Sequence, residues 1–108
     1  MQFLHRHGVA TVARNIRCRR GEIDLVCLDG DILVFVEVRL RSDDRFGGAA
    51  ESITPEKRQR IISAARWWLK GLGHTHTNRV CRFDALLLSQ LDESRITWVR
   101  DAFTANDG

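Results

Sequence analysis

The sequence predicts an α/β fold in which helices flank a mixed central β-sheet, and three observations predict it. Two apolar runs meet at Asp29-Gly30, which is typical of a β-hairpin because both central residues of a type I′ turn take positive φ. Residues 32–38 are apolar on both faces, as in a strand at the centre of a covered sheet. Thr54 and Pro55 open a helix as N-cap and first helical residue.

The composition is that of one globular domain spanning residues 1–108. Hydrophobic residues make up 44% of the chain and charged residues 29%, and no apolar run is as long as a membrane span. The first seven residues lack the apolar core of a signal peptide, and three cysteines cannot all pair with one another. We therefore expect a protein of the reducing cytoplasm that has no membrane partner.

The remaining elements follow from periodicity and from helix-end signals. A helix ends before Gly8, loop composition marks residues 41–52, and the helix after Thr54 ends near Lys70 at a pair of glycines. Trp67 of this helix lies off the buried stripe. We expect it to be partly exposed, as a stacking platform, an interface residue or a residue without a role. The predicted strands are 9–17, 79–88 and a short one over 96–99, and the buried stripe of the helix is Ile61, Ala64, Ala65, Trp68 and Leu72.

Charge is unevenly distributed along the chain, although the net charge is only +3. Residues 1–21 contain five arginines and no acid, whereas residues 22–37 contain five acids and neither lysine nor arginine. Basic flanks could hold a polyanion while a metal ion neutralises the acidic centre, because phosphate contacts supply most of the affinity for nucleic acid. Ordinary solvated charge is the commoner explanation of any single basic run.

Several carboxylates are predicted to share one face of the hairpin. With Asp29-Gly30 as a two-residue loop, Val26 faces Leu33, Asp24 faces Phe35 and Glu22 faces Glu37. Alternation along the strands then places four charged residues on one face: Glu22, Asp24, Glu37 and Arg39. Carboxylates removed from water need a compensating cation. A salt-bridge cluster with nearby arginines and a divalent metal ion held by oxygen ligands both remain open.

Lys57 is a second anomaly, because it lies in the first turn of a helix and on the buried stripe. Its stem could simply cover apolar surface. The helix follows the central strand, however, and such a connection returns over the sheet. We therefore expect Lys57 to lie within reach of Glu37 and Arg39.

A zinc site is less well supported than an oxygen-ligand site. Two histidines and three cysteines are the candidate ligands, but no Cys-x-x-Cys pair occurs and a thiol buried in an apolar strand is common. No residue pattern supports a cysteine or serine nucleophile. Asp84 is assigned only a structural pairing.

Three segments closely resemble the YraN-like bacterial proteins: Asn15-x-Arg17-Cys18-Arg19-x-Gly21-Glu22-Ile23-Asp24-Leu25-Val26, Leu33-Val34-Phe35-Val36-Glu37-Val38-Arg39-x-Arg41, and Arg45-Phe46-Gly47. Lys57, Arg82-Phe83-Asp84 and Asp101-Ala102-Phe103 extend the resemblance over nearly the whole chain. That family is placed in the restriction-endonuclease-like superfamily, beside archaeal Holliday-junction resolvases and other Mg²⁺-dependent nucleases. The superfamily carries an Asp on one strand and Glu-x-Lys on the next.

The resemblance implies a restriction-endonuclease-like domain that hydrolyses DNA phosphodiester bonds with Mg²⁺ or Mn²⁺, on branched or single-stranded substrates. It implies metal binding by Asp24 and Glu37, with Glu22 assisting or binding a second ion. Lys57 and Arg39 would stabilise the phosphate and orient water, and backbone contacts would come from Arg17, Arg19 and Arg41.

Two features depart from the superfamily pattern. Arg39 stands where the superfamily has lysine, and it cannot release a proton as lysine can. The N-terminal helix is shorter than in relatives, where it carries a Gly-Glu pair. A nucleic-acid-binding module that does not cleave, and a protein-interaction adaptor using the Trp67 face, are the alternatives. A homodimer is compatible with these residues.

Overall fold

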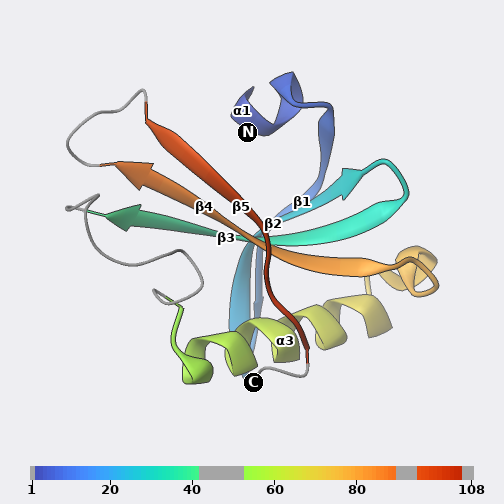
Figure 1. Cartoon of the computed structure of the whole chain (residues 1–108). Coiled ribbons are helices and arrows are strands. Elements are labelled where there is room, and N and C mark those ends of the chain that lie inside the picture. Colours follow the sequence, from blue (N-terminus) through green and yellow to red (C-terminus); the bar gives the residue numbers. More distant parts are fainter. Residues whose placement is uncertain (1, 42–52, 90–94, 106–108) are drawn as a thin grey trace.

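The computed structural model describes residues 2–41, 53–89 and 95–105. Within these residues five strands form one sheet in the order β1-β2-β3-β4-β5 (Figure 1). Strands β3 and β4 are parallel and all other neighbours are antiparallel, so the predicted mixed α/β sheet is confirmed. The elements are α1 (Gln2–Arg6), β1 (Val9–Cys18), β2 (Gly21–Asp29), β3 (Ile32–Arg41), α3 (Pro55–Lys70), the 3₁₀-helix η1 (His74–His76), β4 (Cys81–Ser89) and β5 (Ile96–Phe103).

Strand β3 is the central strand, and a helix covers each face of the sheet (Figure 1). On one face, Phe35 packs in a cluster with Ile61 and Trp68 of α3. On the other face, Val34 and Val36 pack in a second cluster with Leu4 of α1. The two-faced apolar pattern of β3 follows from this burial on both sides. None of the helices in the described residues combines the length and apolarity needed to cross a membrane.

The β2–β3 hairpin forms as predicted, but its register differs from the predicted one. Asp29 pairs with Ile32 and Val26 pairs with Phe35, so the loop residues are Gly30 and Asp31. The predicted pairs Val26–Leu33, Asp24–Phe35 and Glu22–Glu37 are therefore wrong. The physical reason is Gly30, which takes φ +61° at the first central position of the turn, where residues with a side chain are disfavoured.

Helix α3 begins and ends where the sequence predicts. Thr54 Oγ1 accepts a hydrogen bond from Lys57 N at 3.2 Å, and Gly71 N donates to Trp68 O at 3.1 Å at the other end. Trp67 is 51% exposed, as expected. The assignment of Leu72 to the buried stripe is wrong, because the helix ends at Lys70 and Leu72 is 86% exposed.

Close packing of α3 depends on two glycines. A Cβ atom on Gly21, the first residue of β2, would overlap the backbone carbonyl of Arg60, so only glycine lets β2 approach the helix this closely. A Cβ atom on Gly73 would overlap the indole ring of Trp68. The first of these contacts holds the turn between β1 and β2 against the middle of α3.

Strand β4 is parallel to β3, as predicted, and β5 continues to Phe103 rather than ending at Val99. The prediction of a short last strand is wrong because a polar residue, Asp101, interrupts the apolar pattern although the strand continues past it. Asp101 adopts φ +55° and its N–H donates to a carboxylate oxygen of Asp84 at 2.9 Å. Pairing then resumes at Phe103, which stacks on Phe83 with ring centroids 4.9 Å apart.

The remaining boundaries differ little from the predicted ones. Helix α1 ends at Arg6, just before Gly8, which has φ +80°. Strand β1 runs one residue further than predicted, to Cys18, and β4 starts two residues later, at Cys81. The predicted loop and its Arg45-Phe46-Gly47 segment fall almost wholly in 42–52, outside the described residues.

Candidate active site

Three elements converge at one end of the sheet: β2 carries Asp24, β3 carries Glu37, and the first turn of α3 carries Lys57. The β2–β3 pairing stops at Leu25–Val36, one pair before Asp24 and Glu37 would face each other. The corrected register thus brings these two acids closer together than the predicted one did. Their shared face follows from alternation in either register.

The side chain of Asp24 accepts a backbone hydrogen bond from β3 at the point where the β2–β3 pairing stops. Its Oδ2 accepts a hydrogen bond from Val38 N at 2.7 Å, and the side chain is half-buried. On its other side, the β1–β2 pairing omits the Asn15–Asp24 pair, and Asn15 adopts φ +52°. Irregular backbone of this kind costs free energy and gathers at functional sites. Here it opens a hollow of about 310 Å³ beside Asp24, which Arg14 also lines.

Arg14 and Asn15 are neighbours of the site that the sequence reasoning did not single out. The available signal was the asparagine itself, because Asn is depleted in strands and tolerates left-handed backbone better than other residues with side chains. An Asn in the middle of a predicted strand therefore indicates an interruption. Sequence pattern alone did not say that the interruption faces Asp24.

Glu37 is a carboxyl whose ionisation is opposed by its surroundings. It is 7% exposed, and its pKa is raised from 4.5 to about 7. Burial is the largest cause, followed by a side-chain hydrogen bond with Asp24 and by the negative charge of Asp24. The positive charges of Lys57 and Arg39 act in the opposite direction and do not cancel the rise.

Lys57 points toward this acid pair, as predicted. Its Nζ lies 3.8 Å from Oε1 of Glu37, and about a third of the side chain is exposed. Arg39, two residues after Glu37, is half-buried and lies close enough for its charge to lower the pKa of Glu37. Two acids and two cations therefore meet at the junction of β2, β3 and α3.

The other predicted site residues lie apart from this pair or outside the described side chains. Glu22 is half-exposed and its Oε2 lies 3.5 Å from Nε of Arg17, so these two residues form an ion pair on the surface. Arg19 lies in the turn between β1 and β2. Arg41 ends β3, and its side chain is outside the described part of the structure.

The donor set of Asp24 and Glu37 fits a divalent cation. Mg²⁺ prefers oxygen ligands, keeps several waters and is often bound by only one or two carboxylates together with substrate phosphate. Across the described ranges 2–41, 53–89 and 95–105, no three His, Cys, Asp or Glu side chains gather as a metal site. Asp24 and Glu37 form a pair of acids whose negative charges repel each other when both are ionised, and a bound cation would reduce that repulsion.

A second buried acid, Asp84, lies on the opposite face of the sheet and differs sharply from Glu37. Asp84 pairs in register with Val36, which belongs to the α1 face. Its carboxylate accepts hydrogen bonds from Arg82 Nε at 2.8 Å, Arg82 Nη2 at 2.9 Å and Trp98 Nε1 at 2.8 Å. The structural pairing expected for Asp84 is confirmed, because both of its carboxylate oxygens already accept hydrogen bonds within the protein.

The raised pKa of Glu37 predicts a pH-dependent difference between the protein and its Glu37→Gln variant. In the absence of metal ions, the folded protein retains a proton that the unfolded chain releases near pH 4.5. This group's stabilising contribution is therefore complete below about pH 4.5 and is lost as pH rises to about 7. We expect Glu37→Gln to match the wild type in free energy of unfolding at low pH and to exceed it above pH 7 by on the order of 3 kcal/mol.

Urea denaturation in EDTA across this pH range measures that difference. Asp31→Asn is the control, because Asp31 lies fully exposed in the hairpin turn. The control should follow the wild-type curve at every pH. A constant offset between wild type and Glu37→Gln from acid to alkaline pH would contradict a raised pKa.

Comparison with known proteins places the chain in a family. The model of "Uncharacterised protein family UPF0102" matches residues 1–88, a range that includes Asp24, Glu37, Arg39 and Lys57. A UPF0102 protein of Methylobacillus flagellatus is 50% identical over 104 residues, which are 96% of this chain and 88% of that protein. UPF0102 proteins of Nitrosospira multiformis and Nitrosomonas europaea are 49% and 50% identical, over 96% and 94% of this chain and 85% and 83% of their own lengths. The chain therefore belongs to protein family UPF0102.

Proposed function

We propose that this protein is a Mg²⁺-dependent nuclease that hydrolyses phosphodiester bonds of DNA, with Mn²⁺ as an alternative ion. The observation that carries the proposal is the Asp24–Glu37 pair, in which burial and a shared hydrogen bond raise the pKa of Glu37 to about 7 beside Lys57. Perturbed carboxyls on neighbouring strands are a mark of active sites as well as of structural networks. The raised pKa of Glu37 favours an active site, as does the lack of a bidentate arginine partner for either acid among the described residues.

The mixed sheet is what the resemblance to restriction-endonuclease-like proteins implies. An acid on β2 followed by an acid on β3 supports a place in that superfamily, with Asp24 and Glu37 as the two acidic elements of its motif. Arg39 departs from the motif's lysine. Lys57 brings an ammonium group to the same site from the helix, 3.8 Å from Glu37.

Each residue has a distinct task in the proposed reaction. Asp24 and Glu37 would hold the cation, which when bound polarises a phosphoryl oxygen and lowers the pKa of a bound water. Lys57 would stabilise negative charge that develops on the phosphate, because fixed cations in a partly buried site act more strongly than in water. Arg39 would hold a phosphate oxygen through its guanidinium fork and would not exchange a proton. Arg17, Arg19 and Arg41 would contact the nucleic-acid backbone.

A nucleic-acid-binding module without cleavage is the second candidate. Two observations favour it: Arg39 in place of lysine, and an acid pair without a third carboxylate among the described residues. Such a module would bind DNA with a steep dependence on salt but would not hydrolyse it. The two candidates share the fold and differ in turnover.

Metal binding and cleavage are tested separately. In the first measurement, Mg²⁺ or Mn²⁺ is titrated during thermal unfolding, and we expect the midpoint to rise as the ion binds the folded state, with Glu37→Gln abolishing the rise. In the second, end-labelled junction, flap and linear DNA are incubated with each ion and with EDTA as control. Ion-dependent cleavage supports the nuclease, whereas DNA binding without cleavage under either ion supports the module.

A further inference from the structure

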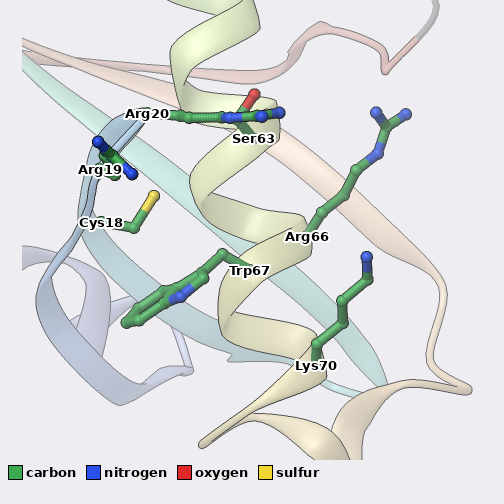
Figure 2. A pocket seen from close by; sticks show the side chains of 7 residues that line it. All are labelled: Cys18, Arg19, Arg20, Ser63, Arg66, Trp67 and Lys70. Atoms are coloured by element: carbon green, nitrogen blue, oxygen red, sulfur yellow. The ribbon is translucent and has the colours of Figure 1, made fainter.

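A basic groove lies between the β1–β2 turn and α3 (Figure 2), and neither Asp24 nor Glu37 lines it. It has a volume of about 440 Å³. One wall is formed by residues 18–20 and the other by the outward side of α3 from Ser63 to Lys70. The close approach of Gly21 to the carbonyl of Arg60 holds these two walls together.

The described residues that line this groove give it a positive charge. Arg19 and Arg20 contribute from the turn, Arg66 and Lys70 contribute from the helix, and none of these lining residues is acidic. Within the described residues none of these four side chains forms an ion pair. Like charges gathered at one groove repel each other, and a bound polyanion would relieve that repulsion. The groove is therefore complementary to phosphates in a row.

An aromatic surface accompanies the cations. Trp67 lines the groove with 51% of its surface exposed, whereas the next residue, Trp68, is 3% exposed and packs in the core. Figure 2 shows the Trp67 ring lying toward the strand end that carries Cys18, with Arg66 and Lys70 extending on the other side of the helix. An exposed indole beside several cations is the arrangement with which proteins bind unpaired bases and their phosphates.

We propose that this groove binds an unpaired strand of nucleic acid, with a base stacked on Trp67 and phosphates against the four cations. A single strand is favoured over a duplex because the ring needs a base whose face is free, and in a duplex both faces are covered by neighbouring bases. The inference rests on the proposed function and names its substrate class: DNA that contains a single-stranded segment.

The groove and the acid pair lie along one helix. Lys57, at the acid pair, precedes Arg66 by nine residues and Lys70 by thirteen, which correspond to roughly 14 and 20 Å at 1.5 Å per residue. Single-strand sites commonly cover about 4–16 nucleotides, so one bound strand can occupy the groove and extend toward the acid pair. The groove would thus hold the unpaired arm of a DNA substrate whose phosphodiester bond is cut at the acid pair.

Binding of a fluorescent oligothymidylate of about 16 nucleotides, measured by anisotropy in EDTA, tests the groove without requiring catalysis. We expect Trp67→Leu to weaken binding about tenfold or more and Trp67→Phe to retain most of it, because phenylalanine keeps an aromatic face. Arg66→Ala and Lys70→Ala should each reduce the slope of log affinity against log salt by about 0.7. Arg6→Ala, which removes an exposed cation on α1 across the sheet, is the control and should leave the slope unchanged.

Several outcomes would overturn the inference. These are equal binding by wild type and Trp67→Leu, stronger binding of duplex than of single strand, and a nucleoside monophosphate that competes as well as the oligonucleotide. This binding measurement is independent of the proposed nuclease activity, because it is made in EDTA, where metal-dependent cleavage cannot occur. Oligonucleotide binding with these signatures but no metal-dependent cleavage would uphold the groove and reject the nuclease, and cleavage that is insensitive to Trp67→Leu would do the reverse.

Discussion

Asp24→Asn and Glu37→Gln should each reduce Mg²⁺-dependent DNA cleavage by about 100-fold or more, because each removes one of the two carboxylates proposed to hold the ion. Both substitutions keep the size of the side chain. Asp24→Asn retains an oxygen that can accept the hydrogen bond from Val38 N, and Glu37→Gln removes a group whose charged form is already disfavoured. Loss of activity should therefore not reflect loss of folding.

Initial rates on the best-cleaved DNA substrate at several Mg²⁺ concentrations measure the effect. Circular dichroism and thermal unfolding in EDTA should show that both variants remain folded. Asp31→Asn is the matched control, since it changes an exposed acid in the same hairpin by the same chemical step. Two folded variants that both cleave at the wild-type rate would exclude the proposed active site, whatever the origin of the activity.

Asp84→Ala should lower the free energy of unfolding by about 3–5 kcal/mol, the largest effect on stability that we expect in this protein. The carboxylate is fully buried and accepts four hydrogen bonds, three from the side chains of Arg82 and Trp98 and one from Asp101 N. Hydrogen bonding with Asp84 is the main cause of the raised pKa of Arg82. Removing the acceptor leaves a mostly buried guanidinium whose one remaining acidic partner among the described residues is Asp29, 3.0 Å away.

Urea denaturation at neutral pH measures this loss, and a fall in the melting temperature of more than about 10 °C should accompany it. Asp31→Ala provides the comparison, because Asp31 also meets an arginine, Arg79, but does so in full solvent at 3.8 Å. That variant should remain close to the wild type in stability. If Asp84→Ala unfolds at the wild-type urea concentration, the network around Asp84 does not stabilise the fold.

The two buried acids show why a site of this kind is only partly readable from sequence. Glu37 and Asp84 both lie in apolar strands, and both would be costly to ionise without a partner. Arg82, two residues before Asp84 and on the same face of its strand, supplies that partner from nearby sequence. Glu37 meets Asp24 and Lys57 from different elements, so its raised pKa depends on how β2, β3 and α3 are assembled.

The sequence by itself determined the local elements of this protein: a turn at the end of β2, a two-faced central strand, and a helix capped by Thr54 and ended by Gly71. The turn and the helix ends depend on interactions between residues close together in the chain, such as a side-chain cap or a preferred φ. The central strand is recognised from its own run of apolar residues, which are suited to burial on both faces. Alternation also placed Asp24 and Glu37 on one face before their register was known, because shifting the turn by one residue changes the sum of paired residue numbers by two and preserves the face.

Only the tertiary structure decided the exact pairing and the surroundings of the charges. Gly30 rather than Asp29 takes the first position of the turn, so the pairs differ from those predicted. Glu22 pairs with Arg17 instead of joining the acid pair, and Arg19 and Arg66 line the same basic groove from its two walls. The hairpin register and the Arg17–Glu22 ion pair are choices among competing local contacts, which the sequence offers without deciding between them. The groove joins residues tens of positions apart, which packing of α3 on the sheet brings together, and no local pattern records such distances.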